Sequence, residues 1–151
     1  MSVDYTIWTD GAFNKKHQIA GWGFYIINSN KQEKQFRGAI PNATSQMGEL
    51  CAAIKALSYI PTPSKIHLIS DSQYLVKGLN EWLYNWKLND WCNNTGHTIK
   101  NKDMWEALDK EQQRHKLTAE WVRGHSETEG NIIADQLAVE GKERYIVANL
   151  T

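Results

Sequence analysis

Three β-like segments precede the first helical segment, and this order restricts the fold more than any other feature of the chain. Residues 3–9 alternate and are rich in β-formers, residues 21–28 read as a second strand, and the polar stretch 31–40 suits an edge strand. The remaining segments follow in the order helix, strand, helix, helix, strand, helix, at about 44–60, 65–70, 72–79, 101–115, 117–122 and 131–144. A meander followed by crossover units predicts an α/β fold: a five-stranded mixed sheet flanked by helices.

The composition is that of a soluble globular protein. A chain of 151 residues, 41% hydrophobic and 23% charged, fits one domain, 1–151. It has no apolar run of membrane-spanning length and no signal-like start, so we expect a cytoplasmic protein. Cys51 and Cys92 lack metal or redox spacing and are expected to be free thiols, with Cys51 in the core. The formal net charge is zero, which counts mildly against nucleic-acid binding but does not exclude local basic surfaces.

Four acids stand where chain segments begin or end. Asp10 directly follows the first β-like segment and Asp71 follows the segment 65–70, while Glu49 and Asp135 lie in the first turns of two helices. Ligands of open α/β sheets gather at the carboxyl ends of strands, so these four side chains are expected to meet in one pocket. A single acid in such a place is more often a turn, cap or dipole residue. The prediction therefore rests on the set of four.

Crowded carboxylates indicate a particular chemistry. They repel one another and take up protons unless a cation is bound. Magnesium prefers such oxygen ligands, and the sequence has no cluster of cysteine and histidine that suggests zinc. Two such ions, about 3.5–4 Å apart, can stabilise the attacking and leaving oxygens of a phosphoryl displacement. The acids therefore favour a metal-dependent phosphodiesterase.

The neighbours of these acids form an ordered set of motifs. They are TDG at 9–11, TSQMGEL at 44–50, SDSQYLVKGL at 70–79, NW at 85–86, KN at 100–101, WVRGH at 121–125 and NxxADQLA at 131–138. Over about residues 5–139 this set resembles the type 1 ribonuclease H (ribonuclease HI) family. The resemblance implies a ribonuclease H-like fold and cleavage of the RNA strand of RNA–DNA hybrids to 5′-phosphate and 3′-hydroxyl ends. It also implies a handle-like segment at about 80–101, whereas residues 141–151 have no counterpart.

The resemblance further implies roles for individual residues. Asp10 and Asp71 would be the central ligands of two Mg²⁺ ions, with Mn²⁺ a possible substitute, and Glu49 and Asp135 would each hold one ion. His125 resembles a loop histidine that assists proton transfer or product departure, a role that imidazole can fill near neutral pH.

The substrate-binding positions implied by the resemblance are short polar groups and one aromatic ring. Some would face the RNA, two would hold a phosphate of the DNA strand, and Trp82 would face the deoxyribose side of the groove. The residues are Gly11, Thr44, Ser45, Gln46, Ser72, Trp82 and Asn101. Thr44 and Ser45 also suit a helix cap, and Asn101 a helix start. We expect Trp86, Trp105 and Trp121 to belong to the core.

The chain departs from the family pattern at the loop after Asp10 and in the handle. The loop carries Lys15, Lys16 and His17, which add positive charge. Between residues 81 and 102 three lysines face two acids, whereas many relatives are far more basic there. Fewer phosphate contacts predict weaker hybrid affinity and a shallower dependence of affinity on salt.

Two other functions fit parts of the pattern. A non-catalytic hybrid-binding module is disfavoured because the acid set is complete. Another nuclease of the ribonuclease H-like superfamily is disfavoured by the handle-like segment and the hybrid-groove residues. The leading expectation is a monomeric, metal-dependent ribonuclease H whose partner is an RNA–DNA hybrid and not a membrane.

Overall fold

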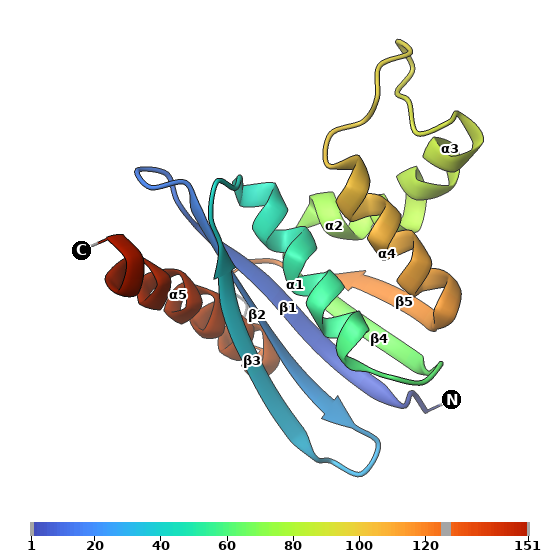
Figure 1. Cartoon of the computed structure of the whole chain (residues 1–151). Coiled ribbons are helices and arrows are strands. Elements are labelled where there is room, and N and C mark those ends of the chain that lie inside the picture. Colours follow the sequence, from blue (N-terminus) through green and yellow to red (C-terminus); the bar gives the residue numbers. More distant parts are fainter. Residues whose placement is uncertain (1, 125–127, 151) are drawn as a thin grey trace.

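The computed structural model describes residues 2–124 and 128–150 and places β-strands and helices as in Figure 1. The strands are β1 (Tyr5–Asn14), β2 (Ile19–Asn28), β3 (Glu33–Ile40), β4 (Lys65–Ser70) and β5 (Lys116–Trp121). The helices are α1 (Ser45–Tyr59), α2 (Gln73–Lys77), the π-helix η1 (Gly78–Trp82), α3 (Leu83–Leu88), α4 (Lys102–Arg114) and α5 (Glu129–Leu150).

The five strands form one mixed sheet in the order β3-β2-β1-β4-β5. The β1, β2 and β3 strands pair antiparallel as a meander, whereas β1, β4 and β5 run parallel because helical crossovers connect them. This arrangement confirms the predicted five-stranded α/β fold.

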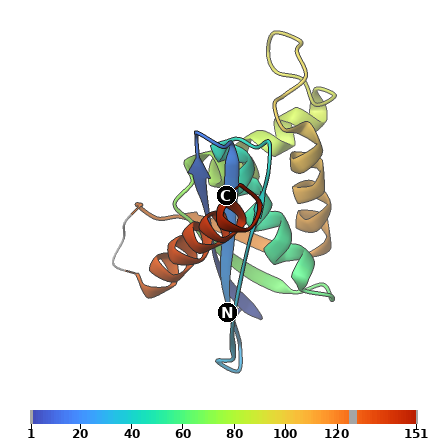
Figure 2. The same ribbon diagram turned by 60° about the vertical axis from the view of Figure 1, so that its left-hand side comes forward.

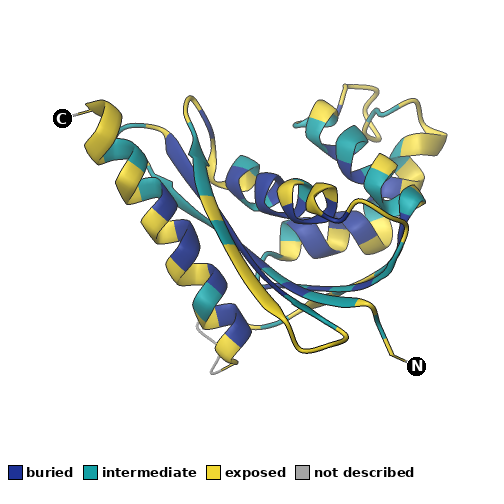
Figure 3. Cartoon of the chain, turned by 60° about the horizontal axis from the view of Figure 1, so that its bottom comes forward, coloured by how far each residue is buried: buried dark blue, intermediate teal, exposed yellow. Residues whose placement is uncertain are grey.

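Helices cover both faces of the sheet. The long helix α5 packs on one face of β1, β2 and β3, and α1 lies on the other face with α4 against it (Figures 2 and 3). The core between α1, α4 and the sheet contains fully buried side chains such as Ile7, Leu50, Leu68 and Trp105. Residues 141–150, which the sequence left unassigned, form the last turns of α5.

The first strand extends further than predicted. Its antiparallel pairing with β2 continues to Asn14, whereas its parallel pairing with β4 ends where Thr9 meets Ser70. Asp10 therefore lies inside β1, opposite Gly23, and does not follow the strand as expected from the sequence. It stands immediately beyond the last parallel pair, and Asp71 immediately follows the end of β4.

The segment after β4 is a chain of short helices rather than one helix. Ser72 caps α2, and the chain passes through η1 into α3, which extends away from the sheet with the loop that follows it (Figure 1). This part corresponds to the handle-like segment. In the described part of the chain, none of the helices combines the length and the apolar character that crossing a membrane requires.

Candidate active site

Three of the four predicted acids come together where the parallel pairing of β1 and β4 ends and α1 begins. Asp10, Glu49 and Asp71 each offer a carboxylate oxygen, and these oxygens all lie within 4.8 Å of one another. Asp10 is buried, with 3% of its surface exposed, and the other two are partly buried. The parallel register places Asp10 and Asp71 on adjacent strands, as the sequence predicted.

A close approach between two backbones places Glu49 in this cluster. A Cβ atom at Gly11 would lie 2.8 Å from the backbone nitrogen of Glu49, so the start of α1 rests directly on β1. Gly48 makes the approach possible from the helix side, since a Cβ there would be 3.1 Å from the Cβ of Ala20. Thr44 fixes where α1 begins, because its side chain accepts a hydrogen bond of 3.2 Å from the Met47 amide.

The end of β5 contacts the backbone at Asp71 from the side of β4 that faces away from β1. The indole of Trp121 donates a 3.0 Å hydrogen bond to the backbone carbonyl of Asp71, and Val122 donates another of 3.0 Å to that of Ser70. Trp121 is 42% exposed, so the prediction that it belongs to the core was wrong. It is the last residue of β5. Gly124 passes beside Asp71, where a Cβ would lie 3.5 Å from Oδ2. His125, the next residue, lies outside the described residues.

The electrostatics of the cluster oppose full ionisation. The pKa of Asp10 is raised to about 9, first by burial and then by the nearby Glu49 and Asp71 carboxylates, although a 2.8 Å hydrogen bond from the Gly11 amide lowers it. Burial raises the pKa of Glu49 to about 8, with Asp71 as the second cause. Without a cation, protons are therefore retained in this cluster at neutral pH.

Asp135 lies at the edge of the cluster. It is exposed on α5 and is not one of the three carboxylates within 4.8 Å, yet its charge also raises the pKa of Asp10 and of Glu49. The structure therefore brings the fourth acid close to the other three without including it among them.

These residues fit a hard divalent cation. Glu49 Oε2 is buried and has no hydrogen-bond partner among the described residues. A buried carboxylate oxygen without a partner is costly unless a positive charge faces it. The donor set consists entirely of carboxylate oxygens, which magnesium and manganese prefer.

The predicted substrate-binding residues fall into two groups. At the start of α1, Thr44, Ser45 and Gln46 are exposed, while Gly11 is partly buried beneath them. Ser72 is also the N-cap of α2, since its Oγ accepts a 3.1 Å hydrogen bond from Leu75.

The second group is organised by Tyr74, which the sequence reasoning did not single out. Its hydroxyl accepts hydrogen bonds from Asn101 Nδ2 at 3.1 Å and from Trp105 Nε1 at 3.0 Å. Its ring lies 6.1 Å from that of Trp82. Tyr74 thus joins Asn101 and Trp82, two of the three predicted DNA-side residues, and its place inside the SDSQY motif was the available signal. Trp86 is partly buried and Trp105 fully buried, in agreement with the prediction.

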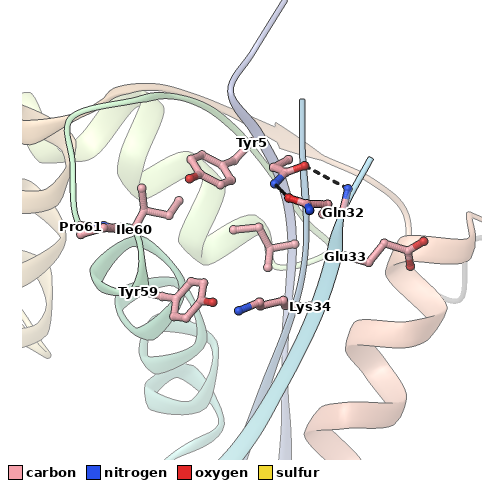
Figure 4. A pocket seen from close by; sticks show the side chains of 9 residues that line it. Tyr5, Gln32, Glu33, Lys34, Tyr59, Ile60 and Pro61 are labelled. Carbon is pink, nitrogen blue, oxygen red and sulfur yellow. Dashed lines mark hydrogen bonds between the residues drawn. The ribbon is translucent and has the colours of Figure 1, made fainter. Parts of the chain in front are cut away.

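A separate hollow of about 690 Å³ lies at the other end of β1 and α1 (Figure 4). Tyr5, Tyr59 and Lys34 surround this hollow. The Glu33 side chain points away from the hollow and accepts a hydrogen bond from the Tyr25 hydroxyl. Because Asp10 and Glu49 lie near the opposite ends of these elements, this hollow is distinct from the acid cluster.

Comparisons with known proteins agree with this fold. The family model described as RNase H matches residues 2–143. Ribonuclease H of Pseudomonas fluorescens is 42% identical over 93% of this chain and 92% of its own length. Ribonuclease HI of Pseudomonas aeruginosa is 41% identical over 89% and 90%. The solution structure of the PFV RNase H domain superposes with a TM-score of 0.78, at 26% identity, over 95% of this chain and 97% of that one.

The mixed sheet and its carboxylate cluster define a metal-dependent nuclease of the ribonuclease H fold. The chain belongs to the ribonuclease H family, and it is an endoribonuclease that hydrolyses phosphodiester bonds. The family and the fold support ribonuclease H activity on RNA–DNA hybrids.

Proposed function

We propose that this protein cuts the RNA strand of RNA–DNA hybrids by two-metal-ion hydrolysis, leaving 5′-phosphate and 3′-hydroxyl ends. The observation that carries the proposal is the cluster of Asp10, Glu49 and Asp71, whose oxygens lie within 4.8 Å of one another inside a ribonuclease H fold. One domain, acting as a monomer in the cytoplasm, is sufficient for this function.

The four acids have distinct roles in this proposal. Asp10 and Asp71 are the central ligands because they lie on adjacent strands, and Glu49 and Asp135 hold the cluster from α1 and α5. When bound, two Mg²⁺ or Mn²⁺ ions would stabilise the attacking and leaving oxygens at the phosphorus. The buried Asp10 cannot rotate freely because Gly11 donates a hydrogen bond to its Oδ1, so its second oxygen keeps a fixed direction. His125 would assist proton transfer or product departure, since imidazole can exchange protons near neutral pH.

The surroundings of the cluster support a hybrid as the substrate. The exposed polar residues Ser45 and Gln46, with Gly11 and Ser72, would contact the RNA strand and its 2′-hydroxyls. Thr44 and Asn101 would position a phosphate of the DNA strand, and Trp82 would lie against its sugars. The shared contact with Tyr74 would hold Asn101 and Trp82 in a fixed relation to each other.

A cleavage assay tests the proposal. End-labelled hybrid, double-stranded RNA and double-stranded DNA are incubated with the protein in magnesium, manganese or EDTA. We expect metal-dependent cutting of the hybrid's RNA strand alone, and its loss in Asp10→Asn while hybrid binding survives. Asp103→Asn, an exposed aspartate in the first turn of α4, is the matched control. Wild-type activity of Asp10→Asn would remove Asp10 from the mechanism.

The other outcomes separate the alternatives. Hybrid binding without cutting in either metal would identify a binding module. Cleavage of plain duplex DNA would identify another nuclease of the ribonuclease H-like superfamily.

A further inference from the structure

A small hollow in the handle-like segment has a lining unlike a phosphate site. It has a volume of about 200 Å³ and lies between α3 and the loop that follows it. Two indoles, one thiol and four asparagines line it; the residues that matter here are Trp82, Trp86, Cys92, Asn85, Asn89 and Asn94. None of the side chains that line it is an acid, a lysine or an arginine. We refer to it as the handle pocket.

We propose that the handle pocket binds one unpaired nucleobase of a single-stranded DNA extension that continues from the hybrid. This proposal rests on the proposed function, because the extension must belong to a bound hybrid. It adds a second point of recognition to the groove contacts, one that depends on a base and not on the backbone.

The chemistry of the lining matches a base. Aromatic rings stack on any nucleobase, and an asparagine amide carries a donor and an acceptor that complement a base edge such as N6 and N7 of adenine. The structure gives the side-chain amides of Asn85, Asn89 and Asn94 no hydrogen-bond partner among the described residues, so they are available to a ligand. A cavity of about 150 Å³ is enough for a benzene ring, so 200 Å³ admits a planar heterocycle.

The charges around the pocket disfavour a phosphate as its ligand. Phosphate recognition depends on arginine, lysine or clustered backbone amides. Lys87 on α3 forms an ion pair with Asp109 on α4, in which Nζ lies 3.1 Å from Oδ1. Asp90, two residues after the end of α3, would repel a phosphate.

The walls of the pocket are set without a ligand. Trp86 stands edge-on to the buried Trp105 at 5.2 Å between ring centroids, which holds its ring in place. After α3 the chain turns through two left-handed residues, Asp90 and Trp91, and the Trp91 amide donates to the Trp86 carbonyl at 2.7 Å. Asn93 Oδ1 then accepts hydrogen bonds from the amides of residues 95 and 97, both at 3.0 Å. A preformed pocket loses little freedom when a base enters.

The position of the pocket supports an extension of the DNA strand. Trp82 lines the pocket and is also the residue proposed to lie against the DNA sugars. A strand that passes Trp82 therefore reaches the pocket as soon as it is no longer paired. Linkage to the bound hybrid raises the effective concentration of the base, so a weak pocket would still be occupied.

The two cysteines supply a direct test. Cys92 lines the pocket and is partly exposed, whereas Cys51 is buried in α1 and serves as an internal control. The protein is treated with N-ethylmaleimide in EDTA, and modification of each thiol is followed by mass spectrometry. Three hybrids are compared. The first has blunt ends, the second has short deoxyadenosine extensions at both ends, and the third has abasic extensions of the same length. At saturation we expect only the base-bearing extension to slow modification of Cys92, by about tenfold.

A second measurement uses affinity in the same conditions. Fluorescence anisotropy should show tighter binding of the base-bearing extension than of the abasic one, by about tenfold for one stacked and hydrogen-bonded base. Asn85→Ala and Asn89→Ala should abolish this difference while leaving binding and cleavage of the blunt hybrid unchanged. Asn30→Ala, in the β2–β3 turn, is the matched control.

Three results would overturn the proposal, and they differ in what else they affect. Equal protection and equal affinity for base-bearing and abasic extensions would exclude a base pocket and leave the proposed hybrid cleavage intact. Failure of the blunt hybrid itself to bind would overturn both this inference and the proposed function. Protection by free deoxyadenosine alone, with no advantage for the extension, would also contradict it, because the base would then not come from a bound strand.

Discussion

The backbones of Gly11 and Glu49 are so close that a Cβ atom at residue 11 would stand 2.8 Å from the Glu49 nitrogen. This contact joins β1, which carries Asp10, to the first turns of α1, which carry Glu49. The same Gly11 amide donates to Asp10 and also favours the ionised form of Glu49 through a hydrogen bond. Main-chain packing therefore sets how close the two residues that carry these carboxylates can lie.

Replacing Gly11 should disable the site without unfolding the protein. In Gly11→Ala the new methyl group meets backbone atoms of residues 48 and 49, which cannot rotate away, so α1 must shift. A displacement of about 1 Å at a catalytic group can reduce a rate by roughly 100-fold, and we expect a loss of that order in hybrid cleavage. Steady-state cleavage and circular dichroism are measured side by side. Wild-type turnover would show that the approach of α1 to β1 is not needed.

The raised pKa values of Asp10 and Glu49 predict how stability without metal depends on pH. The folded protein holds protons on these groups up to about pH 9 and 8, whereas the unfolded chain releases them near 4. The native state thus binds more protons over this interval, and the free energy of unfolding falls as pH rises through it. In EDTA, the melting temperature should decrease from about pH 7 toward pH 9, a range above the titration of His115.

Magnesium should oppose this loss of stability, because a cation favours the ionised carboxylates. We expect the gain in melting temperature from magnesium to grow with pH. Asp10→Asn removes one of the titrating groups, so its melting temperature in EDTA should depend less on pH than that of the wild type. A wild-type melting temperature in EDTA that rises between pH 7 and 9 would contradict the proposed electrostatics of the cluster.

The sequence predicted the sheet and the meeting of three of the four acids because both depend on local patterns. Period-two segments and helical spacing located the five strands, and strand ends located Asp10 and Asp71. The extension of β1 beyond Asp10 was missed, since it depends on pairing with residues 19–23 of β2 and not on the composition of residues 10–14. A polar strand end that carries an active-site acid does not look like a strand.

The tertiary environment of single aromatic residues was the other source of error. Trp121 was expected in the core, yet it stands at an exposed strand end and its indole is hydrogen-bonded to the Asp71 carbonyl. Tyr74 was taken as an ordinary helix residue, although its hydroxyl accepts from two residues about thirty positions away along the chain. Neither contact leaves a periodic signal in the sequence.

His115 should make the fold sensitive to acid. Burial, followed by the neighbouring Arg114 charge, lowers the pKa of this histidine below 6.5. Its Nδ1 accepts a 3.1 Å hydrogen bond from the Ser64 amide, which requires the neutral ring. The unfolded chain takes up the proton more readily, so this contribution to stability is present above about pH 6.5 and is lost as pH falls.

Thermal melts between about pH 7 and 5 measure this effect. His115→Gln should flatten the decline in melting temperature on acidification, at the expense of lower stability at neutral pH. His97→Gln, at an exposed position of the handle loop, is the matched control and should melt like the wild type at each pH. An identical acid profile for His115→Gln and the wild type would exclude His115 as the cause.

The handle should contribute little to the salt dependence of hybrid binding. Each phosphate contact made by a lysine or arginine adds nearly one unit to the slope of log affinity against log salt. Lys87 is held by Asp109 at 3.1 Å, so we expect it to be unavailable to phosphate. The slope measured by anisotropy in EDTA should therefore be shallower than that of a relative with a basic handle.

Asp109→Asn releases Lys87 and should steepen the slope by about one unit, whereas Asp103→Asn, exposed on the same helix, should leave it nearly unchanged. A wild-type slope as steep as that of the basic-handled relative, unaffected by Asp109→Asn, would mean that phosphate contacts outside the handle dominate the affinity.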